Sequence, residues 1–169
     1  MERTARPRSW IAQAALYLGA LAVLATGIDH IEQYYVDKYS TVPTIGTLFL
    51  LNFVTSVIIA AGLVVPLRRI AGRHADAIRA LFAVSGIGFG VLSLVALFVS
   101  ESSGLFGFVE HGYRQAITLA IVAEAAAAVF LVIYLASRHV PRAGAIATRR
   151  HAPGSPTGPA RSRPRTAGS

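Results

Sequence analysis

Residues 116–137 read AITLAIVAEAAAAVFLVIYLAS, an apolar run with one ionisable side chain, Glu124, near its middle. About 20 apolar residues in a helix, rising about 1.5 Å each, cross the roughly 30 Å hydrocarbon core of a bilayer. Helices satisfy their own backbone hydrogen bonds in lipid. The run therefore predicts a transmembrane helix with a carboxyl group at mid-membrane depth, which makes Glu124 a candidate functional residue.

Three further apolar runs of similar length precede this one, over residues 10–27, 45–65 and 80–99. The chain has 169 residues, of which 54% are hydrophobic and only 14% charged, whereas soluble domains carry about a quarter charged residues. We therefore predict an all-α polytopic membrane protein. Its four transmembrane helices would form an up-down bundle within residues 10–137.

The basic residues predict the orientation of this bundle. All but two of the 16, Lys38 and Arg114, lie in residues 1–9, between the second and third runs, or after the fourth. Because basic residues are enriched in cytoplasmic segments, we predict that both termini are cytoplasmic. A cleavable signal peptide is the alternative for the first run, since Ala25-Thr26-Gly27 resembles a cleavage site. The other three helices would keep the same orientation.

The segment 138–169 has a different composition, rich in Pro, Gly, Ser, Thr and Arg. Such a segment buries too little apolar surface to offset its ordering entropy, so we predict a disordered cytoplasmic tail. Its arginines suit anionic lipid headgroups, at about 1 kcal/mol per basic residue near the surface. A partner-docking role is the alternative. No interleaved aromatic residues support binding of nucleic acid.

Small residues form stripes on two of the predicted helices. Ala116, Ala120, Glu124 and Ala128 recur every four residues, as do Gly86 and Gly90. Residues at this spacing share one helix face, and small residues mark close contacts between membrane helices. Glu124 is therefore predicted to face the bundle and not the lipid.

Polar residues on the second and third predicted helices supply partners for Glu124. These are Asn52 and Ser56, four residues apart, and Ser93. An Asn amide can donate a hydrogen bond to a carboxylate or pair with its protonated form. Three interpretations stay open. Glu124 is a neutral acid that fixes helix register by bonding to Asn52 or a serine, or it exchanges a proton or binds a cationic ligand, or it faces the lipid or the membrane interface.

A second polar cluster is predicted at the outer interface, from the connections around residues 28–35 and 106–114. Its members are Asp29, His30, Glu110, His111 and Arg114. Two His and two carboxylates suit zinc or a similar divalent metal, and the same residues suit a hydrogen-bond network. No fixed ligand spacing is present, so the metal stays unknown. There are two other interpretations. The cluster is an ordinary belt of Tyr and polar side chains that caps the helices at the interface, or His30 and His111 bind a haem.

The runs 28–34, 41–52 and 105–112 resemble small four-helix membrane proteins of high-GC actinobacteria. This resemblance implies only the architecture and a bacterial origin. We expect the location to be a bacterial inner membrane. Small multidrug-resistance transporters also combine four helices with one membrane glutamate. In those transporters, however, the glutamate lies in the first helix, whereas here it lies in the fourth.

No cysteine is present, which excludes disulfides, thiolate metal sites and cysteine nucleophiles. With no catalytic constellation in the sequence, we expect a non-enzymatic accessory, sensory or assembly protein without a cofactor. It would associate with itself or with a larger membrane complex. One alternative is a proton-coupled small-molecule transporter that uses Glu124 and Asn52. Another is a metal-binding or redox membrane protein built on the outer cluster.

Overall fold

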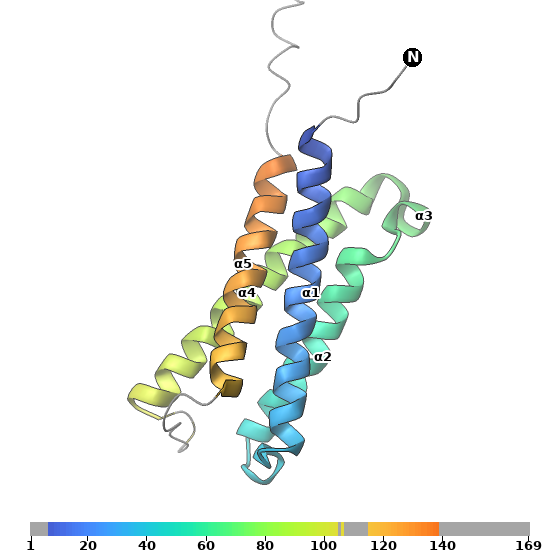
Figure 1. Cartoon of the computed structure of the whole chain (residues 1–169). Helices are drawn as coiled ribbons and strands as arrows, with labels where there is room; N and C mark the ends of the chain where they lie inside the picture. Colours follow the sequence, from blue (N-terminus) through green and yellow to red (C-terminus); the bar gives the residue numbers. More distant parts are fainter. Residues whose placement is uncertain (1–6, 105, 107–114, 139–169) are drawn as a thin grey trace, which may run out of the picture. The chain divides into compact units, whose positions relative to one another are not determined.

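A computed structural model describes residues 7–104, 106 and 115–138, and all regular structure in these ranges is helical (Figure 1). The long helices are α1 (Pro7–Tyr35), α2 (Ile45–Val64), α4 (Ala75–Ser102) and α5 (Gln115–Arg138). The short α3 (Leu67–Ala71) and two 3-10 turns, Tyr39–Thr41 and Gly72–His74, lie in the connections. All four long helices are apolar and long enough to cross a membrane. The prediction of an all-α protein with four helices long and apolar enough to span a membrane is thus confirmed for the described residues.

Two helices are longer than predicted. α4 extends to Ala75 and Ser102, and α1 continues past Gly27 to Tyr35. The prediction that residues 28–35 form a connection is wrong. Polar residues in this segment bond within the helix, since Gln33 Nε2 donates to Asp29 Oδ2 one turn earlier. Because residues four apart are neighbours on a helix, such pairs allow the helix to continue where its hydropathy falls.

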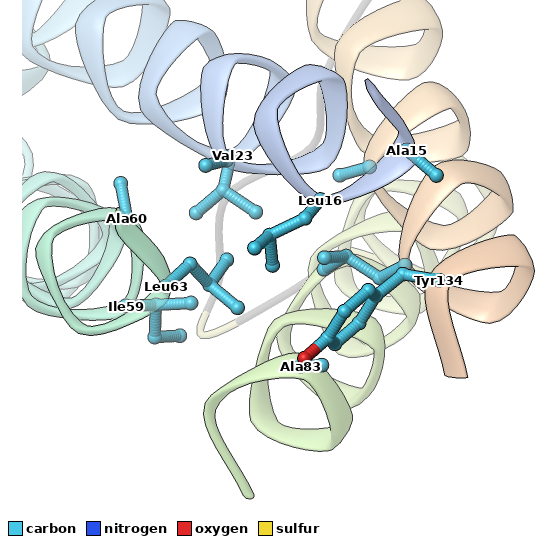
Figure 2. Close-up of a cluster of buried hydrophobic side chains, with 11 residues drawn as sticks. Ala15, Leu16, Val23, Ile59, Ala60, Leu63, Ala83 and Tyr134 are labelled. Carbon is cyan, nitrogen blue, oxygen red and sulfur yellow. The ribbon is translucent and has the colours of Figure 1, made fainter. Parts of the chain in front are cut away.

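The apolar core occupies one part of the bundle, next to the connection that contains α3. It joins the first half of α1, the last third of α2, the beginning of α4 and the end of α5. Figure 2 shows Leu16 and Val23 of α1 facing Ile59 and Leu63 of α2. Burial of such side chains contributes about 1.5–3 kcal/mol each in water, whereas in lipid close packing takes over that role.

Glycines bring the helix backbones together around this core. A β-carbon at Gly19 of α1 would lie 2.6 Å from Leu131 Cδ2, and one at Gly86 of α4 would lie 2.7 Å from Leu131 Cδ1. Leu131 of α5 is fully buried, so it fills the space that these two glycines leave. The predicted close contact of α4 through Gly86 is therefore present, and it fixes α5 between α1 and α4.

Arginine side chains join the helices at this same end of the bundle. Arg79 of α4 donates from Nε to the carbonyl oxygen of Leu63 (3.2 Å) and from Nη2 to that of Val65 (2.9 Å). The last carbonyls of α2 have no partner within their own helix, so Arg79 supplies one for Leu63 and adds a second donor to the carbonyl of the C-cap residue Val65. The core and Arg79 together fix α2 to α4 near α3.

Candidate functional site: a cavity between the helices

A cavity of about 260 Å³ lies between α1, α2, α4 and α5, beyond the apolar core. Its lining is mainly apolar and includes the aromatic rings of Phe49 and Phe89. The polar residues among the lining come from all four helices: His30, Gln33, Asn52, Thr55, Ser93, Ser100 and Glu124. Pockets of this kind, apolar with a few polar groups, are typical of small-molecule sites.

Two buried oxygens in this lining have no hydrogen-bond partner. They are Glu124 Oε1 and Ser100 Oγ, and no other buried side-chain N or O atom in the described part of the chain lacks one. Glu124 is 1% exposed. Leaving a buried polar group unpaired costs about 1–3 kcal/mol, and more when the group is charged. Both residues line the same cavity, so its wall carries two polar groups that have no partner among the described residues.

A chain of polar side chains leads from α2 across α4 to Glu124. Ser56 Oγ donates to Asn52 Oδ1 (3.4 Å), and Asn52 Nδ2 donates to Ser93 Oγ (3.4 Å). The Ser93 hydroxyl in turn interacts with the Glu124 carboxyl group. Because Ser93 accepts from Asn52, its own hydrogen is left for Glu124. The four residues predicted from the sequence do lie together, with Ser93 between Asn52 and Glu124.

His30 lines the same cavity, although the sequence placed it in the outer cluster. Its Nδ1 lies 2.9 Å from the carbonyl oxygen of Thr26. A carbonyl oxygen only accepts, so Nδ1 carries a proton, and in the neutral ring Nε2 is an acceptor. The imidazole packs against Phe49 with ring centroids 4.9 Å apart. Val23, Thr26 and His30 are all buried and recur at helical spacing, so His30 continues the buried face of α1 past the predicted end of the helix.

The predicted outer cluster is only partly within the described ranges. Asp29 is buried in α1 and accepts its hydrogen bond from Gln33. Glu110, His111 and Arg114 lie outside the described residues. Within those ranges, no group of three or more His, Asp or Glu side chains is placed to hold a metal ion. A metal or hydrogen-bond cluster at this end therefore stays a prediction.

The exposed fractions of the lining residues show where the cavity opens. On α2 and α4 some of the apolar lining is exposed, as at Leu51 (55%) and Leu92 (69%), whereas on α5 Ile117 and Ala120 are buried. Figure 1 shows α2 and α4 diverging away from α3. The mouth therefore lies between α2 and α4. Its apolar rim is suited to lipid hydrocarbon.

Comparison with protein-family models, curated proteins and solved structures gives no match for this chain. A fold by itself does not imply a function, so the cavity and its side chains are the features of this protein that bear on its function.

Proposed function

We propose that the protein is a small, non-enzymatic multi-pass membrane protein that binds a small amphiphilic molecule in the cavity between its helices. One observation carries this proposal. The two unpartnered buried oxygens, Glu124 Oε1 and Ser100 Oγ, belong to residues of one mainly apolar cavity. A bound molecule with a polar end would satisfy them, and its apolar part would contact the remaining wall. This role belongs to the sensory or accessory class.

We further propose that both termini are cytoplasmic in a bacterial inner membrane, since the basic residues favour that orientation. The lining of α2 then comes from the half of the helix near its outer end, from Ile45 to Thr55. The mouth of the cavity would thus lie in the outer leaflet, and a ligand would enter from the lipid.

Binding of 4-phenylbutanol to the protein in phosphatidylcholine nanodiscs tests the proposal. Ala96 lines the cavity on α4, so Ala96→Phe fills part of it. Its neighbour Val95 is 51% exposed, so Val95→Phe adds the same ring outside the cavity. We expect the wild type and Val95→Phe to bind, and Ala96→Phe to lose binding. Equal binding by all three would reject the cavity as the site, and so would failure of the wild type to bind either this alcohol or the matching amine, 4-phenylbutylamine.

Proton-coupled transport is the second candidate function. The favouring observation is that the Glu124 carboxyl group, an exchanger of protons, lies in the wall of a cavity and keeps one oxygen free of protein partners. The test is substrate-driven proton flux into liposomes. Flux in the wild type that is lost in Glu124→Gln supports transport, whereas binding without flux leaves the protein a sensor or accessory subunit.

A further inference from the structure

We infer that the molecule taken up by this cavity is a lipophilic monoamine, whose protonated nitrogen donates to Glu124 Oε1 while its apolar body lies between α2 and α4. This inference rests on the proposed function and names its ligand class. Three properties of the cavity lead to it: its charge, its hydrogen-bonding groups and the nature of its walls.

The charge of the cavity favours a cation. Among its described lining residues, Glu124 is the acid and none is Lys or Arg. A second carboxyl group, that of Asp29, is buried on α1 and interacts electrostatically with Glu124. An anionic ligand would therefore meet like charge, which disfavours binding, whereas a cation meets a complementary potential. Because a single carboxyl group belongs to the wall, one positive charge is the best match.

The free hydrogen-bonding groups favour a ligand that donates. Glu124 Oε1 has no hydrogen-bond partner in the described part of the chain, so it is left as an acceptor when the carboxyl group is ionised. His30 adds a second acceptor, Nε2, because Nδ1 donates to Thr26. An ammonium group supplies up to three donors and no acceptor. A carbonyl compound would instead leave these acceptors unpaired.

The walls favour an apolar body of limited size. The volume of about 260 Å³ lies below the roughly 300–1,000 Å³ of typical drug-sized sites. Phe49 and Phe89 belong to the lining, and aromatic faces attract a cation within about 6 Å of the ring centre. Since the rim at Leu51 and Leu92 is apolar and exposed, an amine that partitions into the bilayer reaches the mouth directly.

The experiment compares 4-phenylbutylamine with 4-phenylbutanol, which share a carbon skeleton and differ in charge. Calorimetric titration uses the full chain in phosphatidylcholine nanodiscs, with empty nanodiscs as the baseline. The wild type should bind the amine at least about tenfold more tightly than the alcohol, a difference of about 1.4 kcal/mol. Glu124→Gln should keep alcohol binding and lose the preference. Glu32→Gln, an exposed acid of α1 outside the lining, is the matched control and should keep the preference.

The outcomes separate the ligand class from the cavity itself. Equal affinity of the wild type for amine and alcohol, or an amine preference that survives in Glu124→Gln, overturns the amine assignment but leaves binding in the cavity intact. Failure of both probes to bind the wild type overturns the cavity as a binding site and the amine assignment with it. The ratio measured on the wild type decides the question even where Glu124→Gln does not fold.

Discussion

A β-carbon at Gly90 of α4 would lie 3.3 Å from the backbone carbonyl oxygen of Glu124 in α5. The two backbones therefore meet at the level where the Glu124 side chain lines the cavity. Ser93 follows Gly90 by three residues and shares its helix face. The same close contact thus brings Ser93 near the Glu124 carboxyl group. The small size of Gly90 therefore allows both the approach of α4 to α5 and the proximity of these two side chains.

This contact predicts opposite effects for two glycines of α4. A β-carbon at Gly88 meets nothing within 4 Å, whereas one at Gly90 is crowded by the Glu124 backbone. Gly88→Ala should be neutral or stabilising, because Ala exceeds Gly in helix propensity by about 1 kcal/mol in water. Gly90→Ala should not be stabilised in this way, because the added β-carbon would push α4 away from α5. Reversible unfolding in mixed detergent micelles measures the difference, and equal stability of the two variants would show that the contact is loose.

Leu131 is the side chain on which α1, α4 and α5 converge, so its truncation should be costly. Leu131→Ala removes a fully buried side chain, a change that costs about 2–5 kcal/mol in protein cores. Val132 is its neighbour and is 51% exposed, so Val132→Ala should fall within about 0.5 kcal/mol of the wild type, as surface substitutions do. The same unfolding assay applies. Similar losses of unfolding free energy in both variants would contradict the packing of Leu131 against Gly19 and Gly86.

The proposed orientation predicts which connections are open to each side of the membrane. The chain has no cysteine. Single cysteines introduced at the exposed positions Ser40 and Arg69 would therefore be the only sites in the protein that a maleimide can label. A membrane-impermeant maleimide should label Ser40→Cys on intact cells and Arg69→Cys only after permeabilisation. The reverse pattern would place the termini, and the cavity mouth, on the opposite sides.

Much of this arrangement could be predicted from residue patterns. The four spanning helices follow from the length and apolarity of their runs, because lipid leaves few alternatives for the backbone. The inward position of Glu124 follows from its place on a stripe of small residues that includes Ala120, which is buried as well. The four-residue spacing on α2 likewise places Asn52 and Ser56 on one helix face. Each of these inferences depends on local spacing alone.

The cavity and its α1 residues could not be predicted in the same way. The fall in hydropathy after Gly27 suggested a helix end, but Thr26 and Asp29 provide partners one turn away for His30 and Gln33, so the helix continues and both residues reach the cavity. The cavity itself arises where α2 and α4 diverge, and this divergence depends on packing between distant segments. The outer cluster of His111 and its neighbours lies outside the described residues and stays a prediction.

The most direct test is the structure of the complex with 4-phenylbutylamine in a lipid environment. We expect the amine nitrogen within about 3 Å of Glu124 Oε1, a normal hydrogen-bond distance, with the phenyl ring between α2 and α4. An amine bound elsewhere on the protein, or a Glu124 Oε1 that is hydrogen-bonded to another protein side chain while the cavity has closed, would contradict the assignment of Glu124 as the ligand-binding group.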